Sequence, residues 1–289
     1  MPLVTHDYPM LPRFMSIGNV NPTGAVPGGV CHKFVDEQTD RLDPGGWHLA
    51  IGAGGLLSGC DRLGRNPQFR DLLKTGEQGN YAIQRLLQGR TALAEEFAPN
   101  QRSPIFRANG TRMPGGADYA RHLATNFADW RLVVDGAVAR PQSLSLDQLK
   151  AMPVRQQITR HDCVEGWSAI AKWTGTPLKL LLDRAGMSRD ARFVVLHCAD
   201  PQSNGTMYYE SIDLLDAYHP QTMLAWAIND ALLPVPNGAP LRLRVERQLG
   251  YKHAKYVQRI EAVTSLAGIY GGKGGYWEDV AGYEWYAGL

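Results

Sequence analysis

The most informative segment of the chain reads Arg160-His161-Asp162-Cys163-Val164-Glu165-Gly166-Trp167-Ser168 and holds one cysteine among charged and aromatic residues. Residues 154–159, just before it, are rich in β-branched and polar side chains and predict a strand. Residues 173–177 contain Thr-Gly-Thr-Pro and predict a turn that leads into a helix. We therefore expect Cys163 at a junction between a strand and a loop, where its thiol is presented rather than packed.

Two interpretations of Cys163 follow from its surroundings. A lone cysteine is often an inert buried thiol, and that interpretation stays open. The charged residues on both sides favour a functional thiol, because burying them beside an inert group would be costly without charged partners. Cationic neighbours also favour the thiolate, which is the form that binds a metal or attacks an electrophile.

Three sequence blocks together resemble a known family. Residues 163–168, Cys-Val-Glu-Gly-Trp-Ser, and the following segment 173–178 resemble the molybdenum-ligand segment of the sulfite oxidase superfamily. The nearest branch is that of the small periplasmic methionine sulfoxide reductase catalytic subunits. Residues 237–242, Asn-Gly-Ala-Pro-Leu-Arg, and 250–255, Gly-Tyr-Lys-His-Ala-Lys, follow in the family order. The resemblance extends from about Asn109 to Val263 and implies an α+β, sulfite oxidase-type molybdopterin-binding fold with mixed sheets and short helices.

The composition limits the classes of function. Of the 289 residues 44% are hydrophobic and 20% are charged, as in soluble globular proteins, and the formal charge of +2 predicts no nucleic-acid partner. The cysteines at 31, 60, 163 and 198 have neither zinc-site nor CxxC spacing, so neither a zinc site nor a disulfide scaffold is indicated. No CxxCH haem-attachment motif is present, so electrons would have to pass through a separate partner, for which a membrane haem protein is the expectation.

The sequence predicts three parts: a leader at 1–60, a helical spacer at 61–98 and a molybdopterin-binding oxidoreductase domain at 99–289. Within the leader, the 14-residue apolar run 47–60 is too short to span a bilayer and suits the hydrophobic region of a signal peptide. Its end, Leu57-Ser58-Gly59-Cys60, matches a lipobox, so we expect a periplasmic protein that can be tethered through Cys60. A buried glycine-rich segment is the alternative, and no Arg-Arg pair precedes the run to define an export route.

Local patterns predict the elements of the domain. Apolar residues at three- and four-residue steps predict helix over 66–97. A capping box at Ser145 and Gln148 begins a short helix, and a second helix starts at Thr176-Pro177 and stops at Gly186. Hairpins are predicted with two-residue turns at 135–136 and 229–230. Further strands are expected at 192–198, 240–245 and 256–263, and a helix at 211–217; strands and helices in this irregular order indicate an α+β fold.

The family resemblance assigns the cofactor contacts. It implies that Cys163 binds molybdenum and that one molybdopterin (pyranopterin dithiolene) supplies further sulfur ligands; a soft thiolate suits such a metal. The cofactor phosphate requires cations and N–H donors. The residues that the resemblance places at the cofactor are Asn109, Cys198, Asn237, Arg242, His253 and Lys255. An ordinary turn at 109–110, a core thiol at 198 and a solvated basic strand face around 242–259 are the alternatives.

A second set of residues is expected on the substrate side. Glu165 is the candidate to relay a proton to the leaving oxo group, which requires a pKa raised by burial; pairing with Arg160 or His161 is the alternative. His161 and Trp167 are expected at the substrate mouth. The aromatic residues of 276–286 could form a cover over the domain or a substrate clamp.

The resulting hypothesis is a molybdenum enzyme that reduces a sulfoxide, an N-oxide or a similar small oxo-substrate. Sulfite oxidation ranks lower, because a dianion requires several arginines and only Arg160 lies near Cys163 in sequence. A lipid-anchored binding protein without turnover is the third alternative. Because few residues follow Val263, where the full sulfite oxidase carries a dimerisation domain, we expect a monomer.

Overall fold

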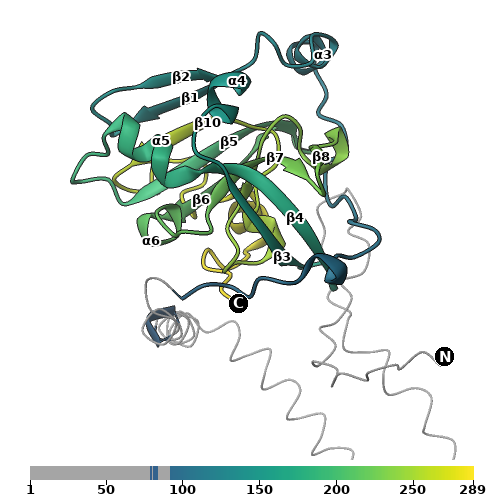
Figure 1. The fold of residues 1–289 in the computed structure, drawn as a ribbon. Helices are drawn as coiled ribbons and strands as arrows, with labels where there is room; N and C mark the ends of the chain where they lie inside the picture. The colour runs from purple at the N-terminus through teal and green to yellow at the C-terminus, as the bar shows by residue number, and fades with distance from the viewer. Residues whose placement is uncertain (1–78, 80, 84–91) are drawn as a thin grey trace, which may run out of the picture. The chain divides into compact units, whose positions relative to one another are not determined.

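A computed structural model describes residues 79, 81–83 and 92–289 (Figure 1). The predicted leader at 1–60, with Cys60, and most of the predicted helix at 66–97 lie outside the described residues. Residues 81–83 are helical, but 92–97 are not, and Glu96 forms a β-bridge with Thr159, so the helix prediction is wrong for 92–97. Residues 81–289 form one compact unit, to which the following description applies.

The first sheet has five strands in the order β2-β1-β10-β5-β6. β1 and β10 run parallel, with Val133 opposite Arg259, and the other neighbours are antiparallel. A parallel pair of strands so distant in sequence joins the start of the domain to its later part. The strands are β1 Arg131–Gly136, β2 Gln142–Ser145, β5 Phe193–Pro201, β6 Met207–Asp213 and β10 Val257–Val263.

The second sheet carries Cys163. Its order is β3-β4-β7-β8, with β9 also paired to β7, and Figure 1 shows the long β3–β4 hairpin extending away from the first sheet. The hairpin pairs Arg155 with Gly175 at one end and Cys163 with Trp167 at the other, so Cys163 is the last residue of its strand, as predicted. The strands are β3 Arg155–Cys163, β4 Trp167–Pro177, β7 Met223–Ile228, β8 Ala231–Leu232 and β9 Arg242–Arg244.

The helices of the domain are short, which together with the mixed sheets confirms the predicted α+β class. The α-helices are α3 Ala117–Ala124, α4 Leu146–Lys150, α5 Leu178–Ala185, α6 Leu214–Ala217 and α7 Tyr276–Ala281. The 3-10 helices are η1 Pro99–Gln101, η2 Val235–Asn237 and η3 Gly250–Lys252.

The main core forms where α5 packs on the first sheet. Burial alternates along β1, and Leu132 and Val134 are fully buried, as expected for a strand with one face in the core. Leu178, Leu181 and Leu182 occupy one face of α5 and join the same cluster. Each such leucine contributes roughly 1.5–3 kcal/mol by leaving water. A smaller cluster surrounds Trp173, between β4 and β7.

Several local predictions are confirmed. Ser145 and Gln148 form the capping box of α4, with the Ser145 hydroxyl accepting from the Gln148 amide at 3.1 Å. α5 stops at Gly186, which is left-handed with φ +70°. Asn229 and Asp230 form the turn between β7 and β8 with φ values of 48° and 67°, as a tight hairpin turn requires.

Other local predictions are wrong, because pairing with strands distant in sequence makes the observed strands longer than predicted. Residues 173–177 belong to β4 rather than to a turn, and the Thr176 hydroxyl donates to the Leu149 carbonyl at 2.8 Å instead of capping α5. Gly136 is still in β1, because it pairs with Ala262 of β10, and the connection to β2 spans 137–141. A Cβ at this position would lie 2.3 Å from the Ala262 carbonyl, so only glycine fits. The predicted helix 211–217 begins only at Leu214, because β6 continues to Asp213.

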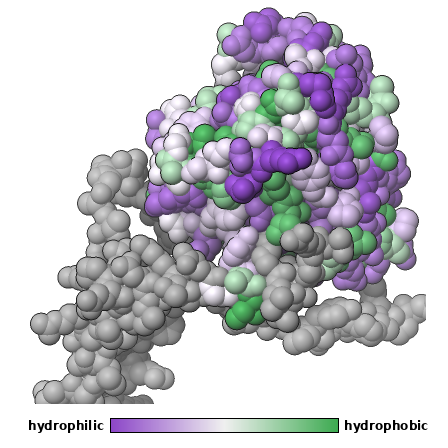
Figure 2. Space-filling model, turned by 90° about the vertical axis from the view of Figure 1, so that its left-hand side faces the viewer, coloured by the Kyte–Doolittle hydropathy of each residue, from purple (hydrophilic) through white to green (hydrophobic). Residues whose placement is uncertain are grey.

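The surface mixes polar and apolar side chains. On the face that Figure 2 shows, hydrophilic groups surround a narrow hydrophobic strip. Within the described part of the chain, none of the helices has the length and apolar composition needed to cross a membrane.

Candidate functional site

A cavity of about 210 Å³ opens beside Cys163. It lies where the 109–111 loop, the β3–β4 turn, the end of β5 and the η3 region meet, and the C-terminal segment forms one wall. The lining residues are Asn109, Gly110, Thr111, Cys163, Val164, Glu165, Asp200, Gln202, Tyr208, Gly250, Tyr251, His253, Lys255, Trp277 and Tyr283. Segments far apart in the sequence therefore build one site.

Cys163 is held at this cavity with little access to water, since only 7% of it is exposed. Burial raises the pKa of its thiol to about 11, and the Glu165 carboxylate raises it further while Arg242 lowers it. The expectation that cationic neighbours would favour the free thiolate is therefore wrong, because burial has the larger effect. A metal that replaced the thiol proton would provide the positive charge that the surroundings lack.

The aromatic wall comes from the C-terminal segment and η3. Trp277 and Tyr283 stack with ring centroids 5.8 Å apart, and Tyr251 meets Tyr283 edge to face at 5.1 Å. All three line the cavity. The tail is thus more than a cover over the domain: part of it forms a wall of the site.

Three hydrogen-bond acceptors at the cavity are buried without partners among the described residues: Asn109 Oδ1, Asp200 Oδ1 and His253 Nδ1. The His253 Nε2 atom lies 2.9 Å from the Gln248 carbonyl, so Nε2 must carry the proton and Nδ1 presents a lone pair. Burial, with Arg244 nearby, holds the pKa of His253 well below its usual value, so the ring stays neutral. A buried acceptor of this kind is satisfied by an N–H or O–H donor, which a bound ligand or an ordered water can supply.

Asp200 is the member of this group that sequence reasoning missed. It lies at the end of β5, is 4% exposed, and accepts from Gln202 Nε2 at 3.1 Å through Oδ2. Burial raises the pKa of its carboxyl group to about 6, although the Thr111 hydroxyl and Lys255 act in the opposite direction. In the sequence only its place directly after the apolar run 193–199 marks this carboxylate, and such a position is not distinctive.

Two buried cations near the cavity have no carboxylate within ion-pair distance among the described residues, in contrast to the neighbouring basic side chains. Arg242 is fully buried, and burial together with Arg244 lowers its pKa to about 9. Lys255 donates to the carbonyls of Asn109 at 2.5 Å, of Pro236 at 3.0 Å and of Thr111. Burial and the charge of Arg242 lower the pKa of Lys255 to about 7.

Two donors in the same region are also unpartnered, Arg242 Nε and Asn237 Nδ2. They come close together because Arg242 donates to the Asn237 carbonyl at 3.1 Å. A buried guanidinium and an amide that both retain free N–H groups suit an anion such as a phosphate. Lys255 contributes charge but no free N–H, since three carbonyls occupy its three donors.

The residues therefore fit a molybdopterin cofactor. The unpartnered donors suit its phosphate, the unpartnered acceptors suit the N–H groups of its ring, and Cys163 suits the metal. Within the described residues, no group of three His, Cys, Asp or Glu side chains is placed to hold a metal ion, so a metal at Cys163 needs ligands from a cofactor.

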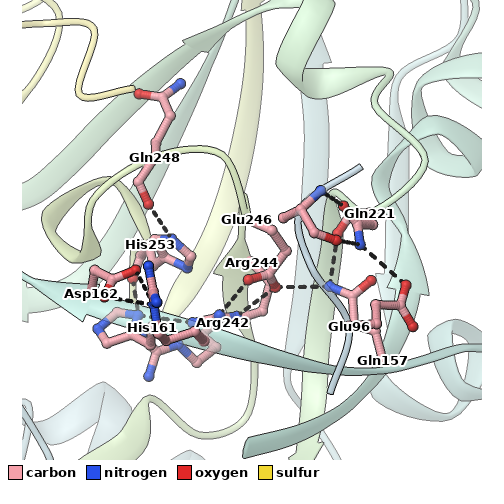
Figure 3. Close-up of polar contacts among 12 residues, drawn as sticks. Glu96, Gln157, His161, Asp162, Gln221, Arg242, Arg244, Glu246, Gln248 and His253 are labelled. Carbon is pink, nitrogen blue, oxygen red and sulfur yellow. Dashed lines mark hydrogen bonds and ion pairs between the residues drawn. The ribbon is translucent and has the colours of Figure 1, made fainter. Parts of the chain in front are cut away.

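His161 does not lie at the cavity mouth. It is 1% exposed, and Arg244 donates to its Nδ1 at 2.9 Å (Figure 3). Arg244 also binds Glu246, with Nε to Oε1 at 2.9 Å, and Glu246 accepts from Gln157 at 2.8 Å. We call these four residues the Arg244 network. The prediction that His161 lines the mouth is wrong, because this network holds the ring in the interior.

Glu165 and Cys198 also differ from expectation. Glu165 is exposed and accepts from the Trp167 indole at 2.9 Å, so the burial expected of a proton-relaying carboxyl group is missing. Its alternative partner Arg160 instead pairs with Asp162 at 2.9 Å. Cys198 is fully buried in the main core and does not line the cavity, which agrees with the core-thiol alternative.

Fold and site thus define the class as a molybdopterin-binding oxidoreductase. The sequence profile of the oxidoreductase molybdopterin binding domain matches residues 120–268, which is about half of the chain. The chain belongs to this family, within the sulfite oxidase superfamily, which confirms the predicted fold, cofactor and enzyme class.

Individual relatives carry related names. A protein from Azospira oryzae, named as a candidate protein-methionine-sulfoxide reductase subunit YedZ1, is 36% identical and aligns over 83% of this chain and 84% of its own length. The protein-methionine-sulfoxide reductase catalytic subunit MsrP of Xanthomonas campestris pv. campestris is 38% identical over 48% of this chain, which spans 47% of that relative. The crystal structure of the sulfane dehydrogenase SoxCD from Paracoccus pantotrophus is similar over 48% of this chain and 39% of its own, with 22% identity and a TM-score of 0.43.

Proposed function

We propose that this molybdopterin oxidoreductase reduces a sulfoxide or a related oxo-substrate by oxygen-atom transfer. The similarity to relatives named methionine sulfoxide reductases supports this reaction. We further propose that it acts in the periplasm, in view of the apolar run 47–60 that ends in Cys60, and that a separate partner, a membrane haem protein, delivers the electrons.

The observation that carries the proposal is the chemistry of the cavity wall around Cys163. The wall is aromatic and acidic, with Trp277, Tyr283, Asp200 and Glu165, and its single lysine has no free N–H. A neutral S=O compound fits such a wall better than a dianion, which would meet the exposed carboxylate of Glu165.

The sulfite-oxidising alternative is correspondingly weaker. Arg160, the arginine nearest to Cys163 in sequence, pairs with Asp162 and lines a different cavity, together with Glu246 and Arg247. Arginine is therefore absent from the residues that line the cavity at Cys163. A sulfite dianion would find no free N–H on Lys255, and the cofactor phosphate competes for the charge of the buried Arg242.

The residues have distinct roles in the proposed reaction. The bound cofactor supplies the two-electron redox chemistry. Cys163 holds the metal, Arg242 and Asn237 bind the phosphate, and the stacked rings of Trp277 and Tyr283 limit the entry of water. Reducing a sulfoxide consumes two electrons and two protons and releases a sulfide and water; Glu165, exposed at the rim, can pass protons from solvent.

Cys163→Ala tests the proposal directly, with Cys198→Ala as a matched control from the other buried cysteine. Wild type and the control should each bind about one molybdenum per chain, whereas Cys163→Ala should lose at least about 100-fold in activity and nearly all of the metal, because the soft ligand is gone. Metal analysis, followed by oxidation of a reduced viologen dye with methionine sulfoxide, measures both. A fully loaded wild type that oxidises the dye with neither S-oxides nor N-oxides, or that only oxidises sulfite, would contradict the proposed reaction.

A further inference from the structure

Three charged side chains that the proposed mechanism does not use are buried beside the aromatic wall of the cavity. Lys252 of η3 donates from Nζ to Oε1 of Glu278 in α7 at 2.7 Å and to Oε1 of Glu210 in β6. Each of the three side chains is at most 1% exposed. We call these residues the Lys252 triad, and it joins three elements that are distant in sequence.

The charges of the Lys252 triad do not balance. It contains two carboxyl groups and one ammonium group, and among the described residues no second cation pairs with either glutamate. In the same part of the chain, Oε2 of each glutamate is buried without a hydrogen-bond partner. Burial raises the pKa of Glu210 well above its usual value, although Lys252 acts in the opposite direction. A buried ion pair adds little net stability and a second buried carboxyl group is costly, so stability alone does not account for Glu278.

The Lys252 triad joins two segments that form the aromatic wall. Tyr251, which precedes Lys252, and Trp277, which precedes Glu278, both line the cavity. Tyr283 fills the space between the two rings, since it stacks with Trp277 at 5.8 Å and meets Tyr251 edge to face at 5.1 Å. The ion pair between Lys252 and Glu278 therefore ties the immediate neighbours of two wall residues to each other.

Close packing at Gly275 leaves the start of α7 little freedom to move. A Cβ at this position would lie 2.1 Å from Oε2 of Glu278 and 2.6 Å from Oε1 of Glu210, so only glycine fits. Gly275 also forms a β-bridge with Glu210. Because Trp277 follows two residues later in α7, the triad and this bridge together fix the backbone that carries its ring.

We propose that Lys252 and Glu278 are positioning residues: their ion pair sets the width of the cavity at its aromatic wall, and with it the fit of the sulfoxide substrate. Neither residue lines the cavity, so each acts through its neighbour in the chain. Buried ionic groups contribute more to specifying one geometry than to stability, and here that geometry belongs to the wall of the site. The effect on the substrate rests on the proposed function, whereas the effect on the width of the cavity does not.

Glu278→Met and Glu278→Gln form a matched pair of variants. The methionine keeps nearly the volume of the side chain but offers Lys252 no strong acceptor, whereas the glutamine keeps both the shape and an accepting oxygen. In both variants Lys252 stays paired with Glu210 and the surplus carboxyl group is gone, so neither should melt far below wild type. Asp216→Asn is the control: it weakens a buried ion pair with Arg247 outside the cavity lining and should lower only the melting temperature.

Two measurements report the width of the cavity. In the cofactor-loaded enzyme, with a reduced viologen dye as electron donor, Glu278→Met should raise the KM for methionine sulfoxide about fivefold or more and leave kcat within about twofold, because substrate binding is weakened while the metal site is untouched. In the full chain from a host that cannot make the cofactor, iodoacetamide should alkylate Cys163 at least about fivefold faster in Glu278→Met, since access to this buried thiol increases. Peptide mass spectrometry follows the alkylation. Glu278→Gln should match wild type in both measurements.

The positioning role is overturned if Glu278→Met matches wild type in the alkylation of Cys163 or, where wild type reduces the sulfoxide, in KM. It is also overturned if Glu278→Gln changes as much as Glu278→Met, because the glutamine keeps the tie. A lower melting temperature with both readouts unchanged, as for Asp216→Asn, would show a structural role only. A loaded wild type that reduces no sulfoxide would contradict the proposed substrate, and the alkylation of Cys163 would then decide the positioning role by itself.

Discussion

Two buried polar clusters lie next to each other in this protein and differ in how their charges are balanced. In the Arg244 network, Arg244 binds Glu246 and both carboxylate oxygens are used. The cofactor cluster is formed by Asn109, Asp200, Asn237, Arg242, His253 and Lys255, and in the described part of the chain neither its cations nor its carboxylate have an ion-pair partner. The His161 and His253 rings, 4.9 Å apart, mark the boundary between the clusters (Figure 3). Paired charges indicate a structural role, and unpaired ones indicate a ligand.

The largest effect on stability is expected from breaking the Arg244 network, in which the charges are paired. Glu246→Gln leaves Arg244 as a buried cation without its carboxylate and should lower the free energy of unfolding by about 3–5 kcal/mol. The loss should be the same with and without cofactor, as measured by urea denaturation. Glu96→Gln is the control: this glutamate, 42% exposed, pairs with Arg155, and its loss should be less than about 1 kcal/mol. If Glu246→Gln lowered the free energy of unfolding only in the cofactor-loaded protein, the Arg244 network would not have a purely structural role.

The next effect concerns pH. The folded-state pKa of Asp200 is about 6 against an ordinary value of 3.8, so the folded state resists ionisation and the cofactor-free protein should lose stability as pH rises through this window. The free energy of unfolding of wild type should lie below that of Asp200→Asn by about 3 kcal/mol at most at pH 7, and this difference should vanish near pH 4. Urea denaturation of both proteins between pH 4 and 8 measures the difference. A difference independent of pH would show that Asp200 is paired in the folded protein.

A third prediction replaces an unpaired cation. Arg242→Met keeps the side-chain length but removes a charge that has no carboxylate partner, so the cofactor-free protein should be as stable as wild type. Bound cofactor should fall about tenfold, because the phosphate loses its charged donor. Pterin and molybdenum content measure cofactor binding, and calorimetry of the cofactor-free protein measures its stability. A destabilisation as large as that of Glu246→Gln would show that Arg242 has a structural role, like the members of the Arg244 network.

The smallest effect is expected at the rim. Glu165 is exposed and contacts the Trp167 indole, so Glu165→Gln should leave cofactor content and melting temperature unchanged. Turnover should fall by less than about tenfold, since solvent can replace the carboxyl group as a proton source. Steady-state kinetics with methionine sulfoxide provide the measurement. A drop of about 100-fold or more would instead make Glu165 essential to proton delivery.

Much of the fold could be predicted because its signals are local. The capping box at Ser145, the stop at Gly186 and the turn at Asn229-Asp230 each depend on a few neighbouring residues. Strand boundaries depend on partners far away in sequence: β1 includes Gly136 because β10 lies beside it, and β4 includes 173–177 because β3 and β7 pair with it. Such pairing is not visible in a local pattern.

Part of the site could likewise be predicted from the sequence, and part of it could not. Family-like blocks located Cys163, Asn109, His253 and Lys255, which do line the cavity. Sequence could not show that Lys255 directs its donors to carbonyls or that His253 presents an acceptor, because both depend on tertiary contacts. The alternative of a solvated basic strand face is wrong for β9, all three residues of which are buried. Asp200 was missed since a single aspartate after a strand has no distinguishing pattern.

The span of the cavity wall bears on how the enzyme is made in the cell. Its lining runs from Asn109 to Tyr283, and the parallel β1–β10 pair joins residues separated by most of the domain. During synthesis the ribosome releases Trp277 and Tyr283 long after Cys163, so a partly translated chain has no closed pocket. The cavity that we assign to the cofactor is therefore complete only when nearly the whole domain has been synthesised.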